Sequence, residues 1–320
     1  IRLINALEGG ERTVNGFLVP SCGIRECLEL VRAESSWDKL RGTLGPGLAL
    51  GVAASGYLSG TAYGTDPEDG EIQSTAELRL SGNGRIVLYY GDDEIGQGSD
   101  TAMAMLASDE TGIPLELFDV LSGDTEQVPV GFGSYSSRVT VMSGTAAIRA
   151  ARSMRAWLVQ AVANHWGVEV ERVEVHPETY TDRDDASREL SIKEVLELAR
   201  AEHGDERASG TYVTVPIKAE GDYPGDTIGA TPTYSANAQV VMVHVDKATG
   251  VVRVLQVWVA HDAGHVINLL AARGQVEGSV HMGVGEALSE ETAYHVGSGE
   301  SQAGRGLHVD PNFLGYSLLT

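Results

Sequence analysis

A stretch of alternating polar and apolar residues, followed by an apolar stretch, predicts a β-hairpin before residue 91. The stretches are 75–80 and 85–90, and Gly82-Asn83-Gly84 lies between them. Alternation places one set of side chains on each face of a strand, and a Gly-Asn-Gly sequence suits a tight reversal. Two further strand-like stretches, 238–245 and 251–260, flank the turn 246–250. We therefore expect two hairpins.

Other segments have the helical spacing of apolar residues or the short apolar runs of strands. The first group predicts helices at 23–35, 99–111, 141–166 and 191–203, and from Gly274-Gln275 to Glu291. Ser99 or Asp100 is the expected N-cap of the second helix and Gly112 its C-cap. Ser191 followed by Glu194 predicts a capping box. Strands are expected at 48–57 (buried), 115–121, 168–176 and 210–217.

The order of these elements favours an α+β fold. Strands and helices mix without the strict alternation of a doubly wound parallel sheet. A hairpin, a Gly-Gln loop and a helix occur in this order near 75–112 and again near 236–291, which suggests an internal duplication. Residues 292–311 are rich in glycine and polar residues and are expected to form an exposed insertion. The chain begins with Ile1 and ends in the apolar Leu318-Leu319-Thr320, so we expect a piece of a longer polypeptide.

Composition limits the possible partners. The chain has 320 residues, 42% of them hydrophobic, and a formal net charge of −22. This acidic balance argues against nucleic acid or an anionic membrane as a partner, because both require clustered lysine and arginine. No run of about eighteen apolar residues occurs, so no transmembrane helix or signal peptide is expected. Cys22 and Cys27 alone cannot ligate an iron–sulfur cluster, and they predict reduced structural thiols in a cytoplasmic protein.

Two glycine- and hydroxyl-rich loops are the strongest candidates for chemistry. The first is 94–101, with Gln97 between Gly96 and Gly98, and the second is 131–138, with serines 134, 136 and 137 before Arg138. Each precedes a predicted helix, so backbone N–H groups and the helix dipole could hold an anionic, polar ligand. Gly274-Gln275 is expected to form a third loop of this kind. Each loop taken alone is equally compatible with a capped tight turn.

Other chemistries lack support in the sequence. The second loop has no third glycine for a dinucleotide fingerprint, and no P-loop lysine motif or Gly-x-Ser-x-Gly elbow occurs. His261, Asp262, His265 and His281 are too loosely spaced for a zinc site, and we expect hydrogen-bonded structural roles for them. Glu286 has Glu290 four residues further on, so a helix-surface acid is expected rather than a general base.

The motifs together resemble the molybdenum hydroxylases, the family of xanthine dehydrogenase and aldehyde oxidoreductase. The matching segments follow in order along nearly the whole chain: 95–101, 112–114, 122–125, 133–138, Gly144, 261–264, 267–268, 274–278 and 283–285. Within this family, 133–140, 21–28, 219–222, 228–231 and 287–292 look closest to the large subunit of the 4-hydroxybenzoyl-CoA reductase branch. Leu269 and His265 depart from the family pattern, and no counterpart of its glutamate base is present before Thr320.

The resemblance implies a two-lobed α+β domain that binds molybdopterin, in the cytosine dinucleotide form, with molybdenum held by the cofactor and by no side chain. The lobes are expected at 1–160 and 161–320. The implied cofactor contacts are Gly96, Gln97, Gly98, Ser99, Thr101, Ser134, Tyr135, Ser136, Ser137, Arg138, Gln275 and Gly278.

The resemblance also implies partners and a reaction. We expect a heteromeric oxidoreductase in which the rest of the molybdenum subunit completes the site and partner subunits carry 2Fe–2S clusters and FAD. A small organic substrate would be hydroxylated or, in the 4-hydroxybenzoyl-CoA reductase branch, lose a phenolic hydroxyl. The alternative is a non-catalytic or split subunit that binds the cofactor or stabilises a catalytic partner.

Overall fold

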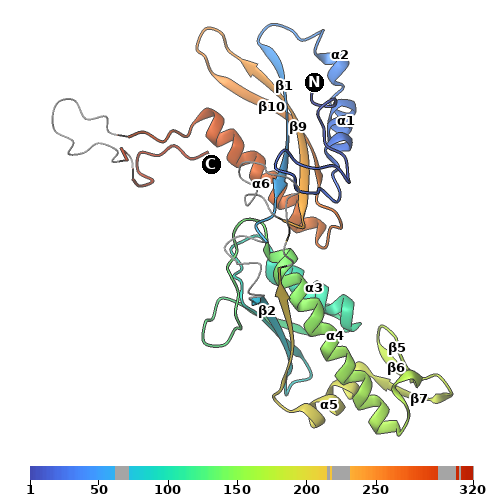
Figure 1. Cartoon of the computed structure of the whole chain (residues 1–320). Coiled ribbons are helices and arrows are strands. Elements are labelled where there is room, and N and C mark those ends of the chain that lie inside the picture. The colour runs from blue at the N-terminus through green and yellow to red at the C-terminus, as the bar shows by residue number, and fades with distance from the viewer. Residues whose placement is uncertain (62–71, 215–216, 218–230, 295–307, 310, 320) are drawn as a thin grey trace. The chain divides into compact units, whose positions relative to one another are not determined.

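The chain forms two compact units, each assembled from segments that are distant in sequence. A computed structural model describes residues 1–61, 72–214, 217, 231–294, 308–309 and 311–319 (Figure 1). The first unit contains Ile1–Leu30, Ala53–Ala238 and Ala260–Asn268, and the second contains Val31–Val52, Gln239–Val259 and Leu269–Thr320. The assignment of cofactor-binding lobes to 1–160 and 161–320 stays a prediction.

A mixed four-stranded sheet forms the centre of the first unit. Its order is β4-β3-β2-β8, with β2 at Ile72–Leu80, β3 at Ile86–Tyr90, β4 at Phe118–Leu121 and β8 at Arg207–Val213. β2 pairs antiparallel with β3, with Leu80 opposite Ile86, which confirms the first predicted hairpin. β8 is antiparallel to β2, whereas β4 is parallel to β3.

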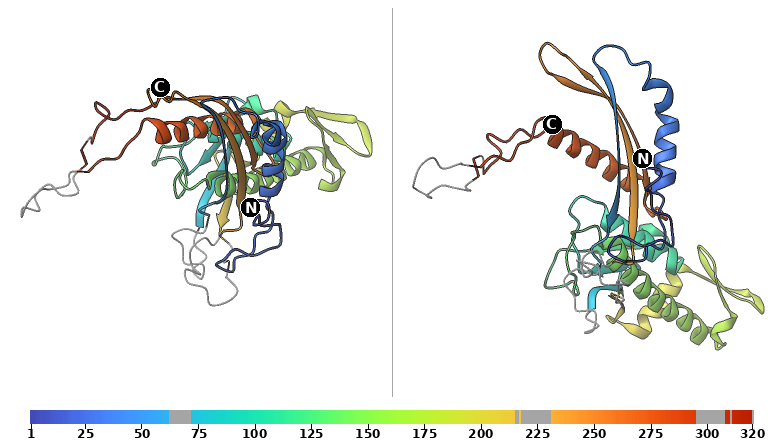
Figure 2. Two further views of the ribbon diagram at one scale, coloured as in Figure 1. Left: turned by 90° about the horizontal axis from the view of Figure 1, so that it is seen from above. Right: turned by 45° about the horizontal axis from the view of Figure 1, so that its top comes forward.

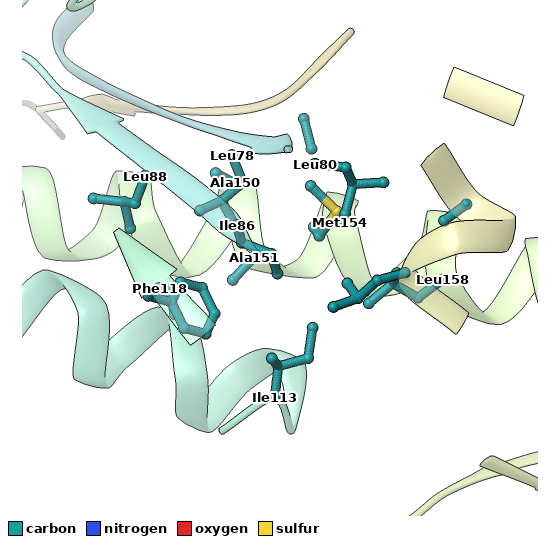
Figure 3. Close-up of a cluster of buried hydrophobic side chains, with 14 of the residues drawn as sticks. Leu78, Leu80, Ile86, Leu88, Ile113, Phe118, Ala150, Ala151, Met154 and Leu158 are labelled. Atoms are coloured by element: carbon teal, nitrogen blue, oxygen red, sulfur yellow. The ribbon is translucent and has the colours of Figure 1, made fainter. Parts of the chain in front are cut away.

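Helices α3 (Ser99–Thr111), α4 (Val139–Trp166) and α5 (Ile192–His203) enclose the core with this sheet. Figure 3 shows strand residues such as Leu78 and Ile86 packed with Met154 and Leu158 of α4. Burying one such side chain fully contributes about 1.5–3 kcal/mol. The predicted C-cap Gly112 and the capping box of Ser191 and Glu194 are both confirmed.

Helix α4 approaches strand β8 closely enough to exclude a side chain. A Cβ atom on Gly210 would lie 2.3 Å from the Ala146 carbonyl oxygen and 2.3 Å from the Ala150 backbone nitrogen. The alanine-rich sequence of α4 therefore allows backbone to pack against backbone. This contact fixes the helix that begins at the second candidate loop.

A small antiparallel sheet completes the first unit. It contains β5 (Val173–Val175), β6 (Thr179–Asp182) and β7 (Asp185–Ser191). The buried Asp182 carboxylate pairs with Arg172 at 2.7 Å and with Arg188 at 3.3 Å. Two predicted strands are shorter than expected, because each begins with a single 3-10 turn: η1 (Leu115–Leu117) before β4 and η2 (Val170–Arg172) before β5. β8 starts three residues earlier than predicted and ends at Val213.

A further sheet has the order β1-β9-β10, with β1 at Leu48–Leu58, β9 at Tyr234–Val245 and β10 at Val252–Asp262. The Asp246 N–H donates to the Val251 carbonyl at 2.9 Å and closes the predicted second turn. Figure 2 shows β9 and β10 side by side in both views. The prediction of a buried strand at 48–57 was wrong, because none of the residues of β1 is buried.

The described residues also form the helices α1 (Ile24–Glu34), α2 (Trp37–Leu40) and α6 (Leu269–Leu288). Helix α6 corrects the prediction of a third loop, because it starts five residues before Gly274 and contains Gly274-Gln275 in its interior. The proposed duplication therefore has a loop in one copy where the other has a helix. Most of the expected insertion at 292–311 lies outside the described residues.

Candidate functional site

The structure brings the two predicted loops of the first unit together, and the first loop also includes residues 91–93, which directly follow β3. Their backbones touch at Gly91 and Gly131, where a Cβ atom on Gly131 would lie 2.3 Å from the carbonyl carbon of Gly91. Val130 and Gly131 also pair with the start of β2: Gly131 forms an antiparallel bridge with Ser74, and the Thr75 N–H donates to the Val130 carbonyl at 2.9 Å. Glycine at both positions is therefore a steric requirement for this crossing.

A buried carboxylate joins the loops. Asp92 is 1% exposed, and its Oδ1 accepts a hydrogen bond from the Gly133 N–H at 2.7 Å. Its Oδ2 accepts from the hydroxyl of Ser143 in α4, and that hydroxyl also contacts the Ser74 hydroxyl at 2.7 Å. Asp92 thus connects the first loop to the second loop and to α4. Sequence reasoning missed it, and the only signal was an acid directly after Gly91.

Ser134 makes a second connection between the loops. Its hydroxyl accepts from the Asp93 N–H at 3.0 Å and donates to the Asp93 carbonyl. A hydroxyl that satisfies both backbone groups of one residue acts as a substitute for strand pairing. In this structure the predicted cofactor contact Ser134 therefore has its donor proton engaged within the protein.

Gln97 lies between two glycines in the left-handed region, Gly96 at φ +97° and Gly98 at φ +84°. Its amide oxygen accepts from the Ile95 N–H at 2.7 Å, and its amide nitrogen donates to the Asp93 carbonyl and the Ser99 hydroxyl, both at 3.0 Å. Ile95 and Gly96 are exposed, and nothing lies within 4 Å of a Cβ atom built on Gly96. The loop therefore has an open backbone surface beside an ordered glutamine.

Helix α3 begins without a side-chain N-cap, which corrects the prediction for Ser99 or Asp100. Gly98 occupies the cap position. Ser99 is instead the first helical residue, where its buried hydroxyl contacts Tyr90 at 2.8 Å. Tyr90 also donates to Asp100 at 2.7 Å, and burial raises the pKa of its phenol well above the usual range. Thr101, another predicted contact, is exposed on the first turn.

The missing cap is supplied by Glu94, a residue to which the sequence reasoning gave no role. Its Oε1 accepts from the Gly96 and Gly98 N–H groups at 2.7 and 3.0 Å. Its Oε2 accepts from the Asp100 N–H at 3.1 Å and from the Ser99 hydroxyl at 3.4 Å. Partial burial disfavours the charged form, but these donors outweigh burial and lower the pKa of Glu94.

Arg138 is buried rather than presented to solvent. It is 1% exposed, its guanidinium lies 3.6 Å from the centre of the Tyr135 ring, and it donates to the carbonyls of Phe132 and Gly133. Its Nη1 has no hydrogen-bond partner among the described residues. Buried donors are nearly always paired. This free donor fits a polar group of a ligand that is brought against the loop.

Ser136 and Ser137 are both left-handed, at φ +57° and +51°. This conformation costs about 1–2 kcal/mol for a residue other than glycine. Two hydrogen bonds hold the pair: the Gly60 N–H donates to the Ser136 carbonyl at 2.9 Å, and the Ser59 hydroxyl donates to the Ser137 carbonyl at 3.0 Å. Strain of this kind concentrates at functional sites, where the surrounding structure stabilises it.

The two predicted contacts in the second unit lie on α6. Gln275 and Gly278 are exposed, and a Cβ atom built on Gly274 or Gly278 would have nothing within 4 Å. Gly274 and Gly278 are four residues apart and so lie on one helix face. Two neighbouring positions on that face therefore carry no side chain and lie beside the exposed amide of Gln275, which is a suitable surface for a planar ligand.

The scattered histidines form no metal centre in the part of the chain that the structure describes, where no three potential ligands gather. Asp262 instead accepts from the Gly23 N–H and the Gly264 N–H, both at 3.0 Å. Glu286 is exposed on α6, as predicted. Among the helices described, none is long and apolar enough to cross a membrane. Cys22 and Cys27 are free thiols, and burial raises the pKa of Cys27.

Two solved structures have the same fold as this chain. Quinoline 2-oxidoreductase from Pseudomonas putida 86 superposes on 93% of this chain and 37% of its own, with a TM-score of 0.73 and 21% identity. Reconstituted CO dehydrogenase from Oligotropha carboxidovorans superposes on 100% of this chain and 40% of its own, with a TM-score of 0.77 and 19% identity. The α+β fold of this chain is thus the same as that of the matching parts of these two oxidoreductases.

Sequence comparison identifies the family. The molybdopterin cofactor-binding domain matches residues 29–320. A putative xanthine dehydrogenase molybdenum-binding subunit from Escherichia coli (strain K12) is 30% identical over 100% of this chain and 40% of its own length. The nicotine 6-hydroxylase large subunit of Paenarthrobacter nicotinovorans is 29% identical over 78% of this chain and 30% of its own. The chain therefore belongs to the molybdenum hydroxylase family, and it spans less than half the length of these relatives.

Proposed function

We propose that this chain forms the molybdopterin-binding portion of a molybdenum-dependent oxidoreductase. The observation that carries the proposal is the crossing of the two loops at Gly91 and Gly131, which Asp92 and Ser134 fix in a single arrangement. The free donor of Arg138 in the first unit supports the proposal, and so do, separately, the two positions of α6 in the second unit that carry no side chain, because each suits contact with a polar cofactor. The cofactor is proposed to be the cytosine dinucleotide form.

The chain's own residues would bind and orient the cofactor. Gln97, the Gly96 and Gly98 backbone, Ser99 and Thr101 would lie along one side of the pterin, with Ser134 to Arg138 beside them. Gln275 and Gly278 would contact it from α6. Bound molybdopterin supplies a metal that exchanges electrons with the substrate. The work of the protein is to hold the cofactor in one orientation and to exclude water from it.

The complete enzyme is proposed to be a cytoplasmic heteromer in which iron–sulfur and FAD subunits carry electrons away. The substrate is proposed to be a small organic molecule, because two of the similar proteins are named for nicotine and quinoline. Hydroxylation is favoured by these names. The reductive direction, on an aromatic acyl-CoA such as 4-hydroxybenzoyl-CoA, is supported only by the segments quoted above.

The test is the molybdenum content and the acid-released nucleotide of the protein isolated with its partners from its native host. Molybdenum and CMP in near-equal amounts are expected. Release of AMP or GMP instead of CMP would show that the cofactor is a different dinucleotide form of molybdopterin. A folded complex with neither metal nor nucleotide would overturn the proposal in favour of a subunit that only stabilises a catalytic partner.

Two variants test the contacts themselves. Gln97→Ala and Gln275→Ala should each weaken cofactor retention by roughly 5- to 150-fold, because a polar group of the buried pterin loses its partner, which costs about 1–3 kcal/mol. Gln160→Ala, on the exposed surface of α4, is the matched control and should retain full molybdenum. Full molybdenum in both test variants would remove the two glutamines from the site.

A further inference from the structure

The turn before α3 is an anion-binding site that the protein itself occupies. Gly96 and Gly98 are both left-handed, and their N–H groups converge with that of Asp100 on the Glu94 carboxylate. Converging backbone N–H groups at the start of a helix are a common receptor for a phosphate. In this structure both carboxylate oxygens accept these bonds.

The carboxylate also determines where Gln97 can be. Gln97 is the residue between the two glycines, and Glu94 binds the N–H group on each side of it. The Ser99 hydroxyl, which receives a bond from the Gln97 amide, also contacts Glu94 at 3.4 Å. Without the carboxylate, three backbone donors and one hydroxyl lose their acceptor, and glycine-flanked backbone is free to adopt other conformations.

Because these donors are satisfied, a phosphate could bind to them only by displacing Glu94. A displaced carboxylate would remain close to the phosphate, and the two negative charges would repel each other. The neighbouring Asp92, Asp93 and Asp100 side chains add to the acidity of this segment. The turn is thus unsuited to a second anion although its backbone has the form of an anion site.

We infer that Glu94 is a positioning residue: its carboxylate fills the anion-binding turn before α3 and fixes the loop that presents Gln97 to the cofactor. This inference rests on the proposed function and refines it. The cofactor meets the first loop through its pterin, and the phosphates of the dinucleotide bind elsewhere. Glu94 acts through the loop and need not touch the cofactor.

The experiment compares Glu94→Ala with Glu194→Ala, in the protein isolated with its partners. Glu194 caps α5 by a similar carboxylate-to-backbone bond and is the matched control. Hydrogen–deuterium exchange should show about tenfold less protection of the Gly96, Gly98 and Asp100 amides in Glu94→Ala, the size expected for a lost cap. Molybdenum content should fall in the same variant and stay at the wild-type level in Glu194→Ala.

Chemical rescue separates positioning from general destabilisation. Acetate can enter the vacated turn, so it should restore both protection and molybdenum content in Glu94→Ala and change neither in the wild type. Three results would overturn the inference: unchanged protection in Glu94→Ala, no rescue by acetate, or stabilisation of the wild-type turn by inorganic phosphate. If the wild type contains no cofactor, the proposed function fails, while exchange and rescue still decide the role of Glu94.

Discussion

The two Gly-Gln segments of this chain have similar local sequences and different structures. Gly96-Gln97-Gly98 forms a loop with two left-handed glycines, while Gly274-Gln275 lies in the interior of α6. The loop has its own acid, Glu94, to bind the freed N–H groups, and α6 has no acid in its first turn. The comparison teaches that the Gly-Gln pair alone does not decide between loop and helix. The loop forms where a nearby side chain can accept the backbone N–H groups that a helix would have paired.

The surroundings reinforce this difference. Around Gly131 a Cβ atom would collide with backbone, whereas around Gly274 and Gly278 it would meet nothing. Glycine thus has opposite roles in the two regions. At the crossing of the two loops glycine permits close contact between two backbones, and on α6 it leaves a surface open.

The largest effect on stability is expected from Gly131→Ala, which adds a methyl group where the two loops cross. The added methyl group must push the two loops apart, which should lower the free energy of unfolding by about 3 kcal/mol. Chemical denaturation with unchanged m-value measures it. Gly84→Ala is the control: the turn has φ +75° and no atom lies within 4 Å of the added methyl group, so this variant adds backbone strain without a collision. Equal losses in both variants would show that the loops do not cross tightly.

Gly98→Ala and Gly278→Ala are expected to change the free energy of unfolding by smaller amounts and in opposite directions. The first places a methyl group on a left-handed residue and should destabilise by about 1–2 kcal/mol. The second replaces glycine in an open helical position and should stabilise by about 0.5–1 kcal/mol. Thermal unfolding of both variants provides the measurement. If both shifts had the same sign, α6 would not be helical at Gly278.

The smallest effect is the response of the first loop to acid. The pKa of Glu94 is lowered in the folded protein, so its stabilisation is complete above the unfolded value, near 4.3, and is lost as the pH falls through the folded value. Exchange protection of the Gly96 and Gly98 amides, corrected for intrinsic rates, should therefore decline below about pH 4. The first-turn amides of α6 have no such acid and provide the internal control. A constant ratio between the two sets across this range would contradict the assignment of Glu94.

Much of the fold follows from local pattern. The hairpin of β2 and β3, the long α4 and the capping box at Ser191 each depend on residues close in sequence, and each was predicted. Helix α6 was only partly predicted, because Gly274 looks like a loop residue although the apolar residues before it continue the helical pattern. Strand β1 looked buried because its residues are small and apolar, yet alternate positions are exposed.

The site was predicted as a set of segments but not as a network. The two loops were recognised from glycine and serine content. Their connections join residues about forty to fifty positions apart, such as Asp92 with Gly133 and Ser143, and no local pattern reveals such pairs. Arg138 was expected to face a ligand because it is a cation in a polar loop. Only the fold shows that the Tyr135 ring covers it.

The close packing of Gly210 against α4 has a mechanical consequence. A helix that touches a strand backbone to backbone cannot slide along it, because any shift would drive Ala146 or Ala150 into the strand. The close packing therefore restrains the N-terminal half of α4, the helix that follows the second loop. Any adjustment on ligand entry has to occur within residues 131–137 or in the first loop. Few residues then become ordered on binding, so the loss of conformational entropy is small.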